Sequence, residues 1–241
     1  MPTATIGRLK WDESGKHLYR TGISMGVLYP GTIDSTTGAV TWGTGVPWNG
    51  LISVSEAPDG ADANDFYADN IKYLSLRGVE NFGGTITCYQ TPEEFDACDG
   101  TATIATGLRV AQQTRMPFCL VYKTQIGNDV AGDDYGYEIH VVYNATASPS
   151  TRDLKTINDS PEPAELSYEF KCNPIEVTGK KRTALATIRS TDFTAQTLTK
   201  LTAVENALFG ETTVEGSTET KVQDPHILTP DEIKTLITTT T

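Results

Sequence analysis

The chain has 241 residues, of which 38% are hydrophobic and 21% charged, and its formal net charge is −12. This length allows one large β domain or two small ones with a sizeable core. We expect no membrane span, since no run of about 18 apolar residues occurs, and no secretion signal, since the first residues lack an apolar segment. A chain this acidic is repelled by phosphate backbones, so we do not expect specific nucleic-acid binding.

Strand signals dominate the chain. β-Branched and aromatic residues alternate with polar ones between Gly, Pro, Asn and Asp, which is typical of strands. The predicted strands are residues 17–29, 39–55 (interrupted by GTGVPWNG), 70–79, 84–90, 117–125, 135–145, 165–177 and 183–190. Within residues 84–90, Ile86 and Cys88 share one face. Thr85, Thr87 and Tyr89 line the other, so we expect a strand with one apolar and one polar face.

Two short helices are predicted from their first residues. In TPEEFDAC (91–98), Thr91 precedes Pro92 and stands three residues before Glu94, which predicts a capping box with proline at the first helical position. The same pattern recurs in TPDEIKTLI, with Thr229, Pro230 and Glu232.

A longer helix is predicted over residues 194–209. Its apolar residues recur near helical spacing, and Gly210 ends it; they include Leu198, Leu201, Val204 and Leu208. Residues 147–163 read as a loop and 211–224 as an extended polar arm. We therefore predict a mainly β fold, a β-sandwich or partial barrel with one flanking α-helix and long loops. The predicted division is a domain at 1–210 and a C-terminal arm with a short terminal helix at 211–241.

An acidic stretch, SEAPDGADANDFYADN, raises the question of a metal site. It holds Glu56, Asp59, Asp62, Asp65 and Asp69. A calcium-binding EF-hand loop needs oxygen ligands at its first, third and fifth positions and glycine at the sixth, and the registers that start at Asp59 and at Asp62 both fail. A calcium site of another kind stays open as an alternative, but we expect a solvated or partner-facing acidic loop and no metal.

Cysteine and histidine spacing does not predict zinc either, because no CxxC pair is present and the histidines lie far apart. The residues concerned are Cys88, Cys98, Cys119, Cys172, His17, His140 and His226. We expect the cysteines to be reduced and mostly buried.

Catalytic motifs are missing from the sequence. There is no G-x-S-x-G elbow and no phosphate-binding P-loop. The pairs Glu93–Glu94 and Asp133–Asp134 read as helix-start and turn residues, and GKKR (179–182) as a charged turn. We expect neither an enzyme nor a cofactor.

One segment, residues 46–100, resembles a known family. It carries WNGL, then E-x-P-x-G-A, YADNIKYL, F-x-x-T-I and a TPEEF helix ending in CDG. In order and spacing these marks resemble the major tail proteins, or tail tube proteins, of long-tailed non-contractile bacteriophages, especially those of Gram-positive hosts.

The resemblance implies a structural virion protein that assembles in the host cytoplasm. Hexameric rings, each lined by one continuous inner β-barrel, would stack into a tube through which DNA passes at ejection without specific binding. The implied partners are further copies of the chain and the tape measure, terminator and tail-tip proteins. Loops and arms of such proteins bridge successive rings.

The acidic stretch falls where a tail tube protein has such a bridging loop. We expect its carboxylates to meet basic groups on the next ring, through ion pairs worth about 0–1 kcal/mol each. The basic candidates are Arg8, Lys10, Lys180, Lys181 and Arg182.

Two other functions remain open at this point. A carbohydrate-binding β-sandwich could use Trp11, Trp42 or Trp48 as a stacking platform, although aromatic residues more often pack in cores. The chain could also form the tube of a related secretion or bacteriocin-like machine.

Overall fold

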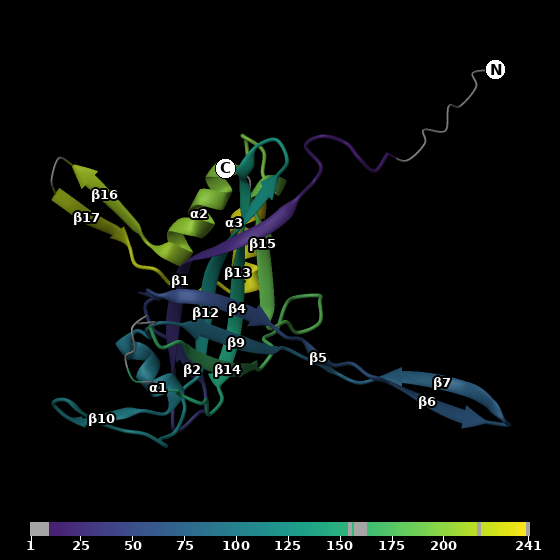
Figure 1. Cartoon of the computed structure of the whole chain (residues 1–241), viewed down its shortest axis with the longest axis horizontal. Helices are drawn as coiled ribbons and strands as arrows, with labels where there is room; N and C mark the ends of the chain where they lie inside the picture. Colours follow the sequence, from purple (N-terminus) through teal and green to yellow (C-terminus); the bar gives the residue numbers. More distant parts are fainter. Residues whose placement is uncertain (1–9, 154–155, 157–162, 216–217, 240–241) are drawn as a thin grey trace.

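The structure, a computed structural model, describes residues 10–153, 156, 163–215 and 218–239. It is mainly β (Figure 1). The strands are β1 (Tyr19–Ile33), β2 (Val40–Trp42), β3 (Val46–Pro47), β4 (Leu51–Glu56), β5 (Asp59–Gly60), β6 (Ala63–Ala68), β7 (Ile71–Arg77), β8 (Glu80–Asn81), β9 (Gly83–Cys88), β10 (Ala102–Ala105), β11 (Leu108–Val110), β12 (Phe118–Asn128), β13 (Gly132–Ala147), β14 (Leu166–Cys172), β15 (Leu185–Arg189), β16 (Glu211–Glu215) and β17 (Thr218–Gln223). The helices are α1 (Asp96–Asp99), α2 (Leu198–Phe209) and α3 (Pro230–Thr238), with 3₁₀ turns η1 (Glu93–Phe95) and η2 (Ser190–Asp192).

One bent antiparallel sheet forms the two layers of the body. The strand order is β2-β1-β12-β13-β14-β9-β4, and β15 pairs with β13 as a branch. We call β1, β12, β13 and β15 the back layer and β4, β9 and β14 the front layer. The long strand β13 joins them, because residues 138–142 pair with β15 and residues 145–147 with β14. Asn144, at φ +47°, lies at this bend, and asparagine adopts positive φ more readily than most residues.

The main core lies between the two layers. The front layer contributes inward side chains such as Ile86 and Phe170, and the back layer contributes Leu120 and Val142. Phe95 closes this core from the η1 turn, and its ring meets three other aromatic rings in tilted or edge-to-face contacts with centroids within 5.4 Å. The predicted mainly β fold is therefore confirmed, and alternation along the strands gives the two layers their inward apolar faces.

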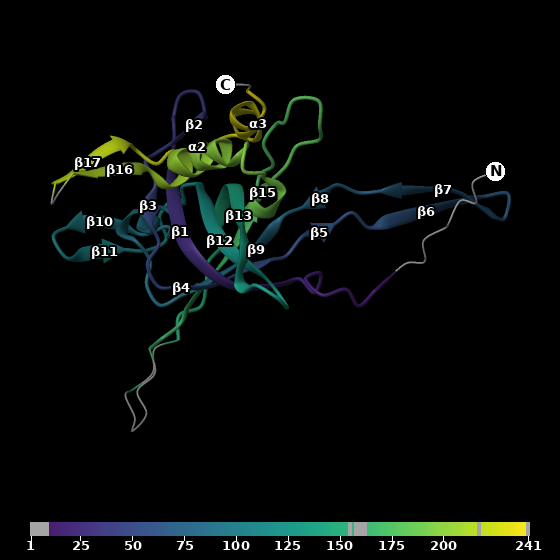
Figure 2. The same ribbon diagram turned by 90° about the horizontal axis from the view of Figure 1, so that it is seen from above.

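The second core lies on the opposite side of the back layer, under the helices (Figure 2). Because strand side chains alternate, Tyr29 and Val121 point to this side while their neighbours point to the first core. In α2 the predicted residues Leu201, Val204 and Leu208 are buried here, but Leu198 at the first turn is half exposed. The predicted flanking helix is confirmed, with a later start.

The two capping-box predictions had opposite outcomes. At α3 the Thr229 side chain accepts from the Glu232 backbone N–H, and the Glu232 carboxylate accepts from the Thr229 N–H at 2.8 Å. At residues 91–98 the prediction is wrong, because η1 and α1 begin without a side-chain cap. The chain turns there so that Phe95 and Cys98 are buried in the core. Their burial stabilises this turn more than a side-chain cap would.

Residues 55–70 are not a loop, and this prediction is wrong. The chain runs out along β5 and β6 and returns along β7 and β8, which together form a long two-stranded antiparallel ribbon that projects away from the body (Figure 1). We call residues 59–81 the ribbon. At its tip Asp69 and Asn70 both have positive φ, at 52° and 64°. These values match the two-residue type I′ turn that suits the twist of a hairpin.

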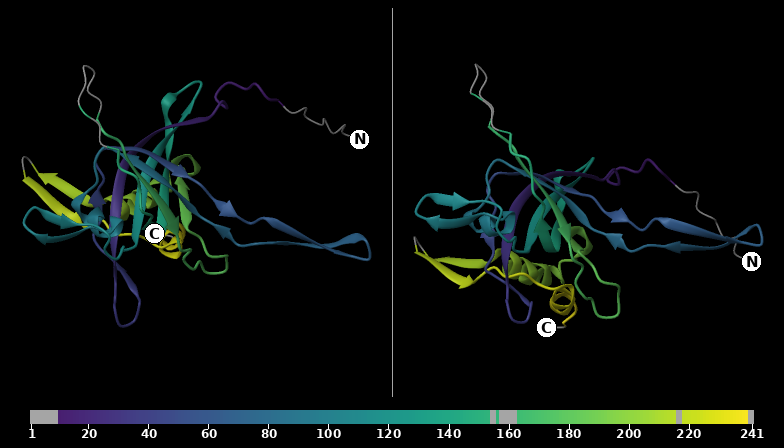
Figure 3. Two further views of the ribbon diagram at one scale, coloured as in Figure 1. Left: turned by 60° about the horizontal axis from the view of Figure 1, so that its bottom comes forward. Right: turned by 90° about the horizontal axis from the view of Figure 1, so that it is seen from below.

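The C-terminal region also differs from the predicted extended arm. Its first part folds back on itself as the β16–β17 hairpin, which projects from the body beside α2 (Figure 3). Leu228 and Ile233 then fix α3 in the second core. The predicted terminal helix is confirmed. Most of the loop predicted at 147–163 lies outside the described residues.

All four cysteines are free and buried, as predicted. Burial raises the pKa of Cys98, Cys119 and Cys172 to about 12. Their thiolates are therefore scarce at neutral pH, so these sulfurs are inert.

Candidate functional site

The ribbon is amphipathic, although every residue of β6 and β7 is exposed. Directly paired residues of an antiparallel ladder share a face. One face therefore holds the pairs Phe66–Leu74, Ala68–Ile71 and Asn64–Leu76, and the other holds Asp65–Ser75, Tyr67–Lys72 and Ala63–Arg77. A bulge at Tyr73 keeps this alternation in register across both halves. We call the first set the apolar face of the ribbon and the second its polar face.

Large apolar side chains on this ribbon remain accessible. Phe66 is 49% exposed, Ile71 64% and Leu76 58%. Such a cluster on an element that projects from the body indicates an interaction site. The sequence analysis did not predict this apolar face. The signal for it is the alternation of apolar residues in FYADNIKYLSL, which the acidic residues of the stretch interrupt.

The predicted acidic residues are distributed along the ribbon and its root. Asp65 pairs with Lys72 across the polar face at 2.7 Å. Asp69 forms the tip turn, and the Asp59 carboxylate accepts from the Gly60 N–H. Glu56 lies apart from them, at the end of β4 in the body.

The predicted basic counterparts lie outside the ribbon. Lys180 and Lys181 are exposed near the turn between Ile175 and Thr183, as predicted for GKKR. Arg182 pairs there with Glu176 at 2.6 Å. Lys10 is exposed, and Arg8 lies outside the described residues.

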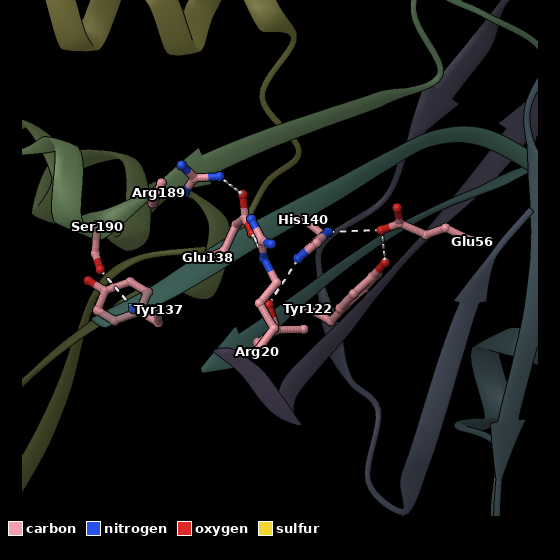
Figure 4. Close-up of polar contacts among 9 residues, drawn as sticks. Arg20, Glu56, Tyr122, Tyr137, Glu138, His140, Arg189 and Ser190 are labelled. Carbon is pink, nitrogen blue, oxygen red and sulfur yellow. Dashed lines mark hydrogen bonds and ion pairs between the residues drawn. The ribbon is translucent and has the colours of Figure 1, made fainter. Parts of the chain in front are cut away.

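A polar cluster holds the root of the ribbon (Figure 4). The Glu56 carboxylate accepts from the Tyr122 hydroxyl at 2.5 Å and lies 2.9 Å from His140 Nδ1. The Thr124 hydroxyl lies 3.0 Å from His140 Nε2, and the Tyr122 and His140 rings stack 4.8 Å apart. Both ring nitrogens of His140 therefore have a polar partner. The cluster thus ties β4 to the back layer where the ribbon begins.

A second ionic group lies beside it. Glu138 is buried, and its two oxygens accept from Arg20 Nε at 2.8 Å and from Arg189 at 3.3 Å. Burial alone would raise the pKa of this carboxyl, but the Arg20 hydrogen bond and the neighbouring positive charges outweigh it and lower the pKa. The group links β1, β13 and β15 across the back layer (Figure 4).

The series Thr124, His140 and Glu56 has the spacing of a catalytic relay. Thr124 is in the middle of β12, between its ladder partners Ile23 on β1 and Glu138 on β13. The ladders on both sides use the backbone groups of this strand, so they do not supply the paired free N–H donors of an oxyanion hole. The cluster is better explained as a structural tie between β4 and the back layer.

Replacing Glu56 by glutamine is expected to lower the unfolding temperature at neutral pH. The His140 hydrogen bond, with help from Tyr122, lowers the pKa of Glu56 below its ordinary value against the opposing effect of burial. A depressed carboxyl pKa stabilises the folded state above the ordinary glutamate pKa, and this stabilisation is lost as the pH falls through the depressed value.

The measurement is thermal unfolding of both proteins from neutral pH into acid. The difference between wild type and Glu56→Gln should shrink in acid. Glu176→Gln is the matched control, because its exposed pair with Arg182 contributes about 0–1 kcal/mol. A Glu56→Gln difference that is zero, or independent of pH, would contradict this role.

The tryptophans do not form a common platform. Trp48 is buried in the main core, and its indole N–H donates to the Gln90 carbonyl. Trp42 packs against the second core, and Trp11 is exposed. Within the described residues, no cluster of His, Cys, Asp and Glu could hold a metal ion, and no helix is long and apolar enough to cross a membrane.

Comparisons with known proteins identify the family. No curated protein sequence matches the chain. One similar solved structure is the sheath–tube complex of an extracellular contractile injection system in its extended state, with 13% identity and a TM-score of 0.29 over 68% of this chain and 88% of that one. Another is the tube-terminating cap of the anti-feeding prophage, with 9% identity and a TM-score of 0.30 over 78% of this chain and 98% of that one. Such low scores carry no argument. A family model described as phage tail tube protein, however, matches residues 28–216, from within β1 to the β16–β17 hairpin. The chain therefore belongs to the phage tail tube protein family.

Proposed function

We propose that the chain is the repeating subunit of a long, non-contractile phage tail, and that it stacks as hexameric rings into the tube. The observation that carries this proposal is the ribbon with its exposed apolar face, in a chain of the tail tube family. A tube subunit needs an element that reaches beyond its own body to the next copy. The ribbon has this form.

Apolar burial is the main source of contact energy in this proposal. Fully burying a side chain such as Phe, Leu or Ile stabilises a contact by about 1.5–3 kcal/mol. An exposed ion pair contributes about 0–1 kcal/mol. Most of the contact free energy would therefore come from burial of Phe66, Leu74 and Leu76. The aspartates would fix the orientation of the two copies and raise the rate at which they meet.

The ionic part of the proposal keeps the acidic residues as contacts between rings. Asp59 and Asp62 would meet exposed basic groups of another copy, such as Lys180 or Lys181. Repetition around each ring and along the tube would multiply such weak contacts.

Replacing Asp59, Asp62 and Asp65 together by asparagine tests this part. We expect slower assembly at low salt and a smaller difference at high salt, because salt screens exposed charges. Turbidity and electron microscopy measure the rate and the product. Assembly that is unchanged at every salt concentration would remove the acidic residues from the interface.

The tube would conduct DNA during genome ejection. A formal net charge of −12 suits a wall that does not retain phosphates. The proposed partners are the tape measure, terminator and tail-tip proteins, with the subunit resident in the virion.

A further inference from the structure

A groove of about 510 Å³ lies on the helical side of the body, between α2, α3 and the root of the β16–β17 hairpin. We call it the helix groove. Apolar side chains from both helices and from the chain that leads into α3 line it, namely Ala203, Ala207, Leu228 and Leu236. Its volume falls in the range of sites that bind small molecules, so it has room for a large side chain.

Two acidic residues, Glu211 and Glu232, also line the helix groove, beside the polar residues Asn206, Gln223 and His226. Among the described residues, no lysine or arginine does so. The Glu232 carboxylate is held by the capping box of α3. The Glu211 carboxylate has no ion-pair partner within the described part of the chain. An apolar groove with a free negative charge suits an apolar group that carries a positive charge beside it.

Trp11 and Lys10 supply this combination, and the body does not cover them. The Trp11 side chain is 78% exposed. Lys10 is exposed too and has no ion-pair partner in the residues that the structure describes. The two acidic residues that follow each contact a basic residue of the same segment; the pairs are Asp12–His17 and Glu13–Lys16. The segment thus presents an indole ring next to a free ammonium group, and tryptophan is among the residues that most often dominate the binding energy of an interface.

The segment leads away from the helix groove of its own chain. Residues 10–18 leave the body on the side to which the ribbon projects, whereas the β16–β17 hairpin beside the groove projects the other way (Figures 1 and 2). A contact between the two therefore joins two copies through unlike surfaces. Such heterologous contacts repeat in one direction, as stacking requires.

We propose that Trp11 of one copy inserts into the helix groove of a neighbouring copy, with Lys10 beside Glu211. This inference rests on the proposed tube function, in which the copies stack in one direction. A tryptophan side chain buries about 150–250 Å² in such a contact. The ribbon and residues 10–18 project in the same general direction (Figure 3), so the two contacts would reinforce each other.

Binding of a labelled peptide to the full-length chain tests this contact without requiring tubes. The probe is KWDESGKHL, residues 10–18, with a fluorophore at its C-terminal end. The receptor is the Trp11→Ala chain, in which no tryptophan of another copy competes for the groove. Fluorescence anisotropy measures the dissociation constant. We expect saturable binding that weakens about thirtyfold or more when alanine replaces the tryptophan of the peptide, the loss typical of a dominant interface residue.

A second change, in the receptor, tests the groove itself. Ala203→Phe places a ring in the groove from an exposed position of α2 and should weaken binding of the unchanged peptide as strongly. Asn206→Phe, which also lies in the groove lining, takes its place if Ala203→Phe does not fold. Thr202→Phe, at the neighbouring exposed position of α2 and outside that lining, is the matched control and should bind like its parent.

The outcomes separate this contact from the tube function. A peptide that does not bind, or that binds the groove-filled receptor as tightly as the Thr202→Phe control, would overturn the contact. Tubes formed by the wild-type chain would still leave the proposed function standing. The expected binding in a wild-type chain that forms no tubes would keep the contact and contradict the tube.

Discussion

Replacing Phe66 and Leu74 together by serine is expected to abolish tube formation while leaving the subunit folded. The two residues are a cross-strand pair on the apolar face of the ribbon. In the single chain their side chains are 49% and 37% exposed, so the body loses little packing when they are shortened. In the tube each would contribute about 1.5–3 kcal/mol of burial. Sedimentation and electron microscopy measure assembly, and thermal unfolding measures the fold.

The matched control is Tyr67→Ser on the polar face of the same strand. Tyr67 is 70% exposed and pairs with Lys72, so its loss removes an aromatic ring of similar size without touching the apolar face. Tubes should form from this variant. If both variants assemble like the wild type, the apolar face of the ribbon is not the contact surface.

Leu201→Ala is expected to destabilise the fold by about 2–5 kcal/mol, the range for truncating a large buried side chain and leaving a cavity. Leu201 lies fully inside the second core, 1% exposed, between α2 and the back layer. In a protein of this size each kcal/mol lowers the unfolding temperature by about 2–4 °C. Circular dichroism during heating or denaturant titration measures the loss.

Leu198→Ala provides the comparison on the same helix, one turn earlier. Leu198 is 52% exposed, so its truncation should change stability by no more than about 0.5 kcal/mol. Equal losses for the two variants would mean that α2 does not seal the second core in the way described.

Most strands of the body could be predicted because alternation in sequence reflects burial on one face. The strand at residues 84–90 is an example: its apolar and hydroxyl residues face the core and the outside as predicted. The helix at 194–209 was also predictable from spacing. Its start was not, since residues 194–197 lie outside α2 and Leu198 in the first turn is half exposed.

The ribbon was not predicted because the many aspartates of residues 55–70 are typical of a loop and interrupt the alternation that is typical of a hairpin. The aspartates indicated a loop, although Asp69 and Asn70 form a two-residue turn between alternating segments, which is a hairpin signal. The root cluster had no local signal, since Glu56 lies 66 positions from Tyr122 and 84 from His140. Folding alone brings these three residues together.

The decisive experiment is electron microscopy of the purified chain at rising protein concentration and over a range of salt. Stacked six-fold rings with a central channel are expected, alone or when tail-tip complexes are added as a nucleus. Single globular particles under every one of these conditions would contradict the proposed tube function.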